Sequence, residues 1–178
     1  MFTWQDLARP KPCPHGSPMY RRIAGNTQWI AQEKVNGWRV LLEVSRGGGI
    51  AITTRTGERL AMPRTDSLQV ASVVPALSQL DCELIRPWRA LIVFDVLRLA
   101  DRDMARTALS ERLMRLGALS LDGSKLGSVR TVRCGNVDEV DEFYNGVLAG
   151  GGEGIVLKRL EDPYPAKGVV WLKTKPGL

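Results

Sequence analysis

The chain has 178 residues, of which 44% are hydrophobic and 25% are charged, enough for one domain with a packed core. Its 25 basic and 19 acidic residues give a formal net charge of +6. No apolar run is long enough to span a bilayer and no secretory signal opens the chain, so the composition excludes an integral membrane protein and predicts a soluble, cytoplasmic one.

Cysteine and histidine usage excludes several classes of site. Cys13, Cys82 and Cys134 are widely spaced, so they form neither a disulfide framework nor a CxxC zinc site. His15 is the only histidine, which removes most metal-ligand sets and histidine-based catalytic triads. The basic charge fits a polyanionic partner, although solvated arginine faces are the equally simple alternative.

The first half of the chain combines predicted strands with two short helices. The predicted elements are a helix over 1–8, an extended proline-rich segment over 9–18, strands over 29–34, 38–44 and 49–54, and a helix over 66–73 capped by Thr65 or Asp66. The second and third of these strands alternate in part and form a hairpin turned by residues 45–48.

The second half continues with two hairpin strands, two helices and two closing strands. The predicted elements are strands over 78–84 and 91–97 joined by a turn around Pro87, a helix over 107–116, a loop over 121–125, a helix from its cap Asn136 to about Leu148, and strands over 154–160 and 169–175. Hairpins mixed with isolated helices argue against a regular βαβ alternation, so the sequence predicts an α+β fold with antiparallel β-sheets flanked by helices.

Lysine is scarce beside arginine, with 7 lysines against 18 arginines, and its positions are informative. Four lysines lie at strand ends or inside apolar strand patterns: Lys34, Lys158, Lys173 and Lys175. Residues i and i+2 of a strand share a face, so Lys173 and Lys175 are predicted to point the same way. Carboxylates also lie in or beside predicted strands, at Glu83, Asp95 and Glu153.

Lysines and carboxylates gathered on sheet surfaces are typical of a cleft for a nucleoside triphosphate and its Mg²⁺. Neither a P-loop nor a GxGxxG turn is present, so such a nucleotide would bind in another manner. The alternative is that the lysines lie at sheet edges and protect them from pairing.

Six segments, in order along the chain, resemble the motifs of ATP-dependent DNA ligases, within the covalent nucleotidyltransferase superfamily. They are EKVNGWR at 33–39, TRTG at 54–57, LDCEL at 80–84, VFDVL at 93–97, EGIVLKR at 153–159 and WLKTK at 171–175. The first is similar to the KxDGxR motif and the fifth to motif IV almost letter for letter. The resemblance implies an ATP-grasp-like ligase adenylation domain.

The resemblance also implies the roles of the site residues. Lys34 would attack the α-phosphate of ATP and form a lysyl-adenylate, a task that requires an amine able to lose its proton, unlike Arg. The implied nucleotide-binding residues are Glu33, Arg39, Arg55, Glu83, Phe94, Lys158, Lys173 and Lys175. Glu83 and Glu153 would hold Mg²⁺. The residues alone also allow another interpretation, in which Phe94 and Trp171 are core aromatics and Asp95 is the partner of an arginine.

Three departures from the family pattern bear on these expectations. Asn36 stands where Asp is usual, and only a tight hairpin fits between Glu83 and Phe94. An OB-fold domain usually follows the last motif, whereas three residues follow it here. We therefore expect a single adenylation domain over residues 1–178 without an OB-fold, either cut from a larger ligase or naturally minimal; Met1 and the helix-like start fit a natural N-terminus.

The expected function is ATP-dependent sealing of nicked double-stranded DNA, as in repair, recombination and replication, with ATP as co-substrate and Mg²⁺ as cofactor. We expect a monomer without membrane contact, whose OB-fold or DNA-binding function could come from a separate partner. The alternatives are an RNA ligase, a capping-type nucleotidyltransferase using GTP, or a non-catalytic nucleotide- or nucleic-acid-binding module.

Overall fold

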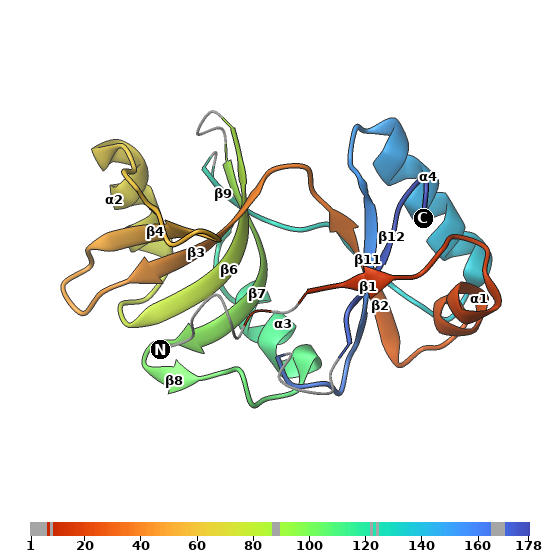
Figure 1. Cartoon of the computed structure of the whole chain (residues 1–178). Helices are drawn as coiled ribbons and strands as arrows, with labels where there is room; N and C mark the ends of the chain where they lie inside the picture. Colours follow the sequence, from red (N-terminus) through yellow and green to blue (C-terminus); the bar gives the residue numbers. More distant parts are fainter. Residues whose placement is uncertain (1–6, 8, 87–89, 122, 124, 165–169) are drawn as a thin grey trace.

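A smaller sheet forms one half of the molecule, as Figure 1 shows. The computed structural model describes residues 7, 9–86, 90–121, 123, 125–164 and 170–178. In spatial order the strands of the smaller sheet are β1 (Lys11–Pro12), β12 (Leu172–Thr174), β11 (Gly154–Arg159), β2 (Trp29–Lys34) and β10 (Thr131–Arg133). Strand β1 pairs with β12 in parallel, and the other pairs are antiparallel.

A larger sheet forms the other half. Its strands in spatial order are β5 (Arg59–Leu60), β4 (Ile50–Thr54), β3 (Trp38–Val44), β6 (Ser78–Ile85), β7 (Ala90–Leu99) and β8 (Arg102–Asp103), with β9 (Leu126–Ser128) pairing with β7 in parallel. Residues 35–37 carry the chain directly from β2 of the smaller sheet to β3 of the larger one. The two sheets are therefore joined through the EKVNGWR segment at 33–39.

Helices pack against both sheets. They are α1 (Pro18–Ala24), α2 (Arg64–Val73), α3 (Leu109–Gly117) and α4 (Val137–Ala149). Helices α1 and α4 pack on the smaller sheet, α2 contacts β4, and α3 contacts β7. Among the described residues, no helix is long and apolar enough to cross a membrane.

Separate apolar clusters support the two sheets and the seam between them. The core of the larger sheet includes Leu42, Leu80 and Val93, and that of the smaller sheet includes Tyr20 and Ile155. A third cluster joins the sheets: Leu7, Leu41, Leu97, Ala105, Tyr164 and Trp171, with Phe94 and Val156 packed against it. The aromatic residues of this cluster thus form the base of the space between the sheets.

The predicted α+β class with antiparallel sheets is confirmed, and most predicted strands lie within two residues of their observed bounds. The predicted helix over 66–73 starts earlier: its N-cap is Pro63, with no side-chain cap, so the choice of Thr65 or Asp66 was wrong. Helix α3 begins at Leu109 rather than residue 107. The last strand is confined to β12, shorter than the predicted range over 169–175.

Other differences arise where short elements depend on tertiary contacts. Helix α1 was not predicted, although Ser17 caps it through a hydrogen bond from the Tyr20 amide and Pro18 opens it. Strands β1, β8, β9 and β10 have two or three residues each, too short for a periodic signal. The predicted helix over 1–8 (Leu7 apart), the turn around Pro87 and the start of the last predicted strand lie outside the described residues.

A fully buried ion pair fixes α3 against the larger sheet. The guanidinium of Arg112 donates to both carboxylate oxygens of Asp95, at 2.7 and 3.1 Å. Arg112 also donates to the carbonyl oxygens of Thr107 and Asp162, at 2.6 and 3.1 Å. Asp95 is thus an arginine partner, which was one of the two interpretations of the VFDVL segment.

We expect Asp95→Asn to lower the free energy of unfolding by about 3–5 kcal/mol, because it leaves a buried guanidinium without its counter-charge. Chemical denaturation followed by circular dichroism measures this loss. The control is Glu111→Gln on the same helix, whose half-exposed pairs with Arg102 and Arg115 contribute about 1 kcal/mol or less. Equal losses in the two variants would contradict the importance of burial.

Candidate active site

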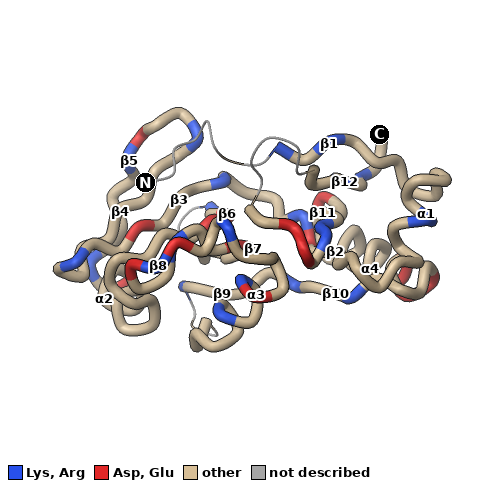
Figure 2. Tube along the Cα trace, turned by 90° about the horizontal axis from the view of Figure 1, so that it is seen from below, with Lys and Arg blue, Asp and Glu red and all other residues tan. Residues whose placement is uncertain are grey.

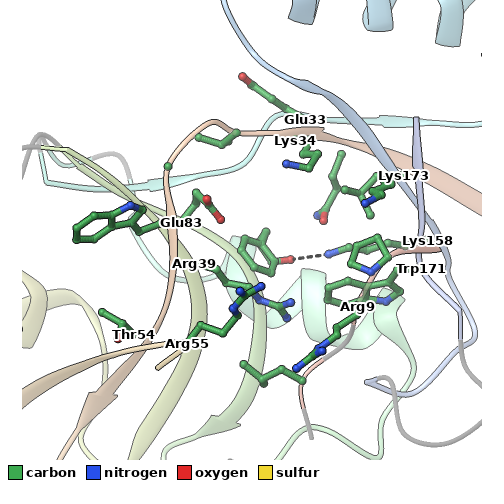
Figure 3. A pocket seen from close by; sticks show the side chains of 18 of the residues that line it. Arg9, Glu33, Lys34, Arg39, Thr54, Arg55, Glu83, Lys158, Trp171 and Lys173 are labelled. Atoms are coloured by element: carbon green, nitrogen blue, oxygen red, sulfur yellow. Dashed lines mark hydrogen bonds between the residues drawn. The ribbon is translucent and has the colours of Figure 1, made fainter. Parts of the chain in front are cut away.

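A cavity of about 700 Å³ lies between the two sheets (Figure 3). Most of the predicted site residues line it: Glu33, Lys34, Arg39, Arg55, Glu83, Phe94, Lys158 and Lys173. Glu153 adjoins it through an ion pair with Lys34. Lys175, which directly follows β12, is absent from the lining. The structure therefore brings together side chains that are up to 140 residues apart in the sequence.

Strand register places the polar groups of the smaller sheet on one face. Gln32 lies opposite Val156 of β11, and Val156 lies opposite Lys173 of β12. Residues that are directly paired across a sheet point to the same side of it. Lys34 lies two residues after Gln32 on the same strand, so its side chain points to that side as well. Lys34 lies opposite Gly154. These side chains therefore face the cavity as a group.

Gly154 is required where β11 begins. Its φ is +141°, and a Cβ atom there would lie 2.1 Å from the carbonyl oxygen of Thr174. Only glycine allows β11 to approach β12 this closely beside Lys34. This explains, in physical terms, why glycine stands between Glu153 and the strand.

Lys34 forms an ion pair with Glu153, and both side chains are about one-third exposed. The backbone reinforces this contact, since the amide of Glu153 donates to the Lys34 carbonyl oxygen at 3.0 Å. The neighbouring Glu33 carboxylate accepts a hydrogen bond from Arg130 at 2.6 Å. The ion pair thus holds the Lys34 side chain beside the Glu153 carboxylate, and Figure 3 shows Lys34 at one end of the cavity.

The opposite wall carries a buried network around Arg39. Its guanidinium donates to both carboxylate oxygens of the fully buried Asp81, at 3.0 and 2.6 Å, and to the Tyr164 hydroxyl at 3.0 Å. Arg39 also lies over the ring of Phe94, with 5.4 Å from its central carbon to the ring centroid. Asp81 and Tyr164 therefore hold the guanidinium in one orientation beside the cavity.

Glu83 lies next to Arg39 on this wall, opposite Ile92 of β7. Burial raises the pKa of its carboxyl to about 7, and the opposing attraction of Lys34 and Arg39 does not cancel this effect. At a pH below this pKa, a cation that binds Glu83 must first displace the proton from the carboxyl group.

Lys158 is almost completely buried beneath the cavity. Its ammonium lies 3.8 Å from the Trp171 ring centroid and 5.0 Å from that of Phe94, and it donates to the Phe94 carbonyl oxygen at 3.4 Å. Burial lowers the pKa of Lys158 to about 8, although Asp95, 4.0 Å away, favours the charged form. Lys158 therefore supports the aromatic base of the cavity.

The sequence reasoning missed Gln32, Arg9 and Trp38, which also line the cavity. Gln32 is 1% exposed, and neither its amide nitrogen nor its oxygen has a hydrogen-bond partner among the described residues. The position of Gln32 in the sequence, two residues before Lys34, could have identified it, because alternate residues of a strand lie on one face of the sheet. Trp38 is 41% exposed, with the Arg86 guanidinium stacked over its ring.

The carboxylates of this site fit Mg²⁺. Glu83 and Glu153 would supply oxygen ligands, and Mg²⁺ is usually bound by one or two carboxylates together with substrate phosphates and water. No group of three His, Cys, Asp or Glu side chains forms a metal-binding set in the described ranges. The donor set thus suits a metal that arrives with a phosphate substrate rather than one enclosed by protein.

Comparison with known proteins identifies related sequences. Residues 85–175 match the family described as ATP dependent DNA ligase domain. A protein of Kineococcus radiotolerans named "Probable DNA ligase" is 31% identical over 201 residues, which cover 90% of this chain and 39% of that protein. A "DNA ligase" of Thermococcus onnurineus is 35% identical over 88 residues, 48% of this chain and 16% of that protein.

Solved structures share the fold at lower identity. The structure titled "mycobacterial DNA ligase D complexed with ATP and MES" superposes with a TM-score of 0.66 at 21% identity, covering 98% of this chain and 62% of that one. An archaeal ATP-dependent RNA ligase gives 0.61 at 19% identity, covering 95% and 48%. The chain spans less than two-fifths of the length of the two sequence relatives.

We expect Glu83→Gln to become progressively more stable than the wild type as the pH rises from about 4.5 to 7. A carboxyl whose pKa is raised by folding stabilises the fold fully at a pH below its pKa in the unfolded chain. This contribution is lost as the pH rises through about 7, the pKa in the folded protein. Urea unfolding at several pH values measures the difference. Glu161→Gln, at an exposed position outside the cavity lining, is the matched control. A stability difference that does not change with pH would contradict the raised pKa.

Proposed function

Since the chain belongs to the ATP dependent DNA ligase domain family, we propose that it catalyses the nucleotidyl-transfer chemistry of a DNA ligase. Lys34 is the nucleophile, ATP the co-substrate, and a nicked double-stranded DNA the acceptor. The observation that carries this proposal is the position of Lys34 within a cavity lined by Arg39, Glu83 and Lys173. Both sheets contribute to that cavity, so the described residues act together as one adenylation domain.

In the first step the neutral amine of Lys34 attacks the α-phosphorus of ATP. The new bond joins Nζ to phosphorus, the bond from phosphorus to the bridging oxygen breaks, and pyrophosphate leaves with that electron pair. The amine must lose a proton, and Glu153, its ion-pair partner, is the nearest carboxylate placed to receive it. An arginine at this position would stay protonated and could not react.

Charge on the phosphates is neutralised from several sides. Lys173 lies on the same sheet face as Lys34, and Arg39 faces them from the larger sheet. Glu83 and Glu153 would hold Mg²⁺, which supplies further positive charge to the phosphate oxygens when it is bound. The ammonium of Lys158 is buried, so it does not touch the phosphates. It stabilises their charge through its electric field and supports the aromatic floor of the cavity.

The base of the nucleotide fits over the apolar floor of the cavity. Phe94, Val156 and Trp171 line this part, next to the unpartnered Gln32 amide. A buried amide without partners destabilises the empty protein, and the hydrogen-bonding edge of a purine offers it both a donor and an acceptor. Gln32 therefore contacts the base edge while Lys34, farther along the same strand, reaches the α-phosphate.

Two further steps complete the reaction. A 5′-phosphate oxygen at the nick attacks the phosphorus of the lysyl-adenylate, which breaks the N–P bond and returns the electron pair to Lys34. A 3′-hydroxyl then attacks the activated 5′-phosphate, forms the phosphodiester and releases AMP. We propose that a single chain performs these steps, since the lysine, its ion-pair partner and the phosphate-binding cations all come from one protomer.

We expect incubation with α-labelled ATP and Mg²⁺ to label the wild-type chain covalently, and Lys34→Arg to lose the label completely. Arginine preserves the charge and the pairing with Glu153 but cannot become a neutral nucleophile. Denaturing electrophoresis measures the retained label. Lys125→Arg, at a lysine paired with Asp66 outside the cavity lining, is the control and should label normally. A labelled Lys34→Arg chain, or a wild type labelled by GTP instead of ATP, would contradict the assignment.

We expect Gln32→Leu to change stability and nucleotide binding in opposite directions. Removing an unsatisfied buried amide raises the free energy of unfolding by about 1 kcal/mol, whereas losing contacts to the base weakens nucleotide binding about tenfold. Denaturation and calorimetric titration with a non-hydrolysable ATP analogue measure the two effects. Unchanged affinity in a stabilised variant would remove Gln32 from the base site.

A further inference from the structure

A group of three cations and two buried carboxylates lies beneath the cavity. The cations are Arg39, Arg112 and Lys158, and the carboxylates are Asp81 and Asp95. Both oxygens of Asp81 accept hydrogen bonds from Arg39, and both oxygens of Asp95 accept from Arg112. Each carboxylate is thus matched to one arginine, which leaves Lys158 as the cation in excess within this group.

The Lys158 amine has few partners for a buried charge. Its side chain is 2% exposed, and its only hydrogen bond among the described residues goes to the Phe94 carbonyl oxygen, at 3.4 Å. An Asp95 carboxylate oxygen lies 4.0 Å away, too far for a hydrogen bond. An ammonium has three N–H donors, so two of them find no acceptor within the described ranges. A neutral amine avoids much of the cost of this burial.

The charges around Lys158 do not restore its ordinary pKa. Burial is the largest effect, and it lowers the pKa of Lys158 to about 8. Asp95 of β7 and Asp81 of β6 oppose this shift, whereas Arg112 of α3 and Arg39 of β3 add to it. At pH 8 the empty protein therefore holds Lys158 about half in its neutral form.

Charge elsewhere on the chain does not form a one-sided field that would change this balance. In the view of Figure 2, Lys and Arg positions alternate with Asp and Glu positions over both halves of the trace rather than forming one basic face. Closer to the site, the Tyr164 hydroxyl donates to Asp81, and burial keeps this phenol neutral by raising its pKa. The protonation of Lys158 therefore depends on the groups beneath the cavity and on what the cavity holds.

We propose that Lys158 takes up a proton from solvent when a nucleoside triphosphate enters the cavity, and that it then acts as a positioning residue for the nucleotide base. This rests on the proposed function, which places a nucleotide there. The triphosphate brings negative charge above the floor, and this charge favours the ammonium form of Lys158 through the low-dielectric interior. The nucleotide thus supplies the counter-charge that the two carboxylates, already paired with arginines, do not provide.

The charged form of Lys158 acts on the base through the aromatic floor. Figure 3 shows Lys158 beside Trp171. Its nitrogen lies 3.8 Å from the Trp171 ring centroid and 5.0 Å from that of Phe94. A cation attracts the electron-rich face of an aromatic ring, and a neutral amine does not. Proton uptake therefore holds both rings beneath the base while the triphosphate is bound, and proton loss removes the excess charge when the cavity empties.

The test measures proton uptake by calorimetric titration of a non-hydrolysable ATP analogue with Mg²⁺ in buffers of different ionisation enthalpy. We expect the wild type to take up about half a proton per nucleotide at pH 8, because half of Lys158 is neutral before binding. The affinity should fall about fivefold between pH 8 and 9.5, since binding then requires a proton that is scarcer. The pKa of Glu83, about 7, lies below this range, so Glu83 contributes little.

Three variants assign the proton to one residue. Lys158→Met keeps a side chain of similar length without a titrating group, so we expect it to take up no proton and to bind with an affinity that does not change between pH 8 and 9.5. Lys125→Met, the matched control, removes a lysine outside the cavity lining and should keep the wild-type uptake. Lys34→Arg should also keep it, because arginine does not titrate in this range.

Three results would overturn the inference: no proton uptake by the wild type at pH 8, wild-type uptake in a folded Lys158→Met chain, or loss of the uptake in Lys34→Arg. If Lys158→Met does not fold, a wild-type affinity that stays constant between pH 8 and 9.5 overturns it without that variant. Covalent labelling by ATP in the same preparation reports separately on the proposed function. Proton-linked binding without labelling would reject the reaction and keep the role of Lys158, whereas a wild type that binds no nucleotide would reject both.

Discussion

The pairing of β2 with β11 is the constraint on which the site depends. This register places Lys34 opposite Gly154 and Gln32 opposite Val156, so that the Lys34 amine and the unpartnered Gln32 amide face one cavity. A shift of one residue would turn both side chains away from it, because alternate residues of a strand point to opposite faces. Gly154 protects the register, since any side chain there would collide with the backbone of β12.

Buried charge is the second condition that the fold must satisfy. Arg39 and Arg112 each have a carboxylate partner, Asp81 and Asp95, that is itself fully buried. Such pairs give little net stability but strongly penalise any arrangement that separates them, which favours one geometry of the walls. Lys34 differs because its side chain remains partly exposed beside Glu153, which leaves it accessible to a substrate.

Much of this arrangement could be predicted from the sequence, and the remainder depended on tertiary contacts. The strands around Lys34 and Gly154 carry strong apolar patterns, and the order of the motif-like segments pointed to the residues that the cavity brings together. Arg9 could not be predicted, because extended, proline-rich chain gives no periodic signal, and β1, which follows Arg9, is placed by its pairing with β12. The burial of Lys158 beneath Trp171 was equally hidden, since a strand pattern does not reveal which face another sheet covers.

The central claim is that the Lys34 side chain becomes covalently attached to the nucleotide. Mass spectrometry of the intact chain after incubation with ATP and Mg²⁺, followed by peptide mapping, tests it most directly. The account predicts one added adenylyl group, located on the peptide that contains Lys34, and removed by excess pyrophosphate. An adduct on any other residue, or a folded chain that gains no mass, would contradict it.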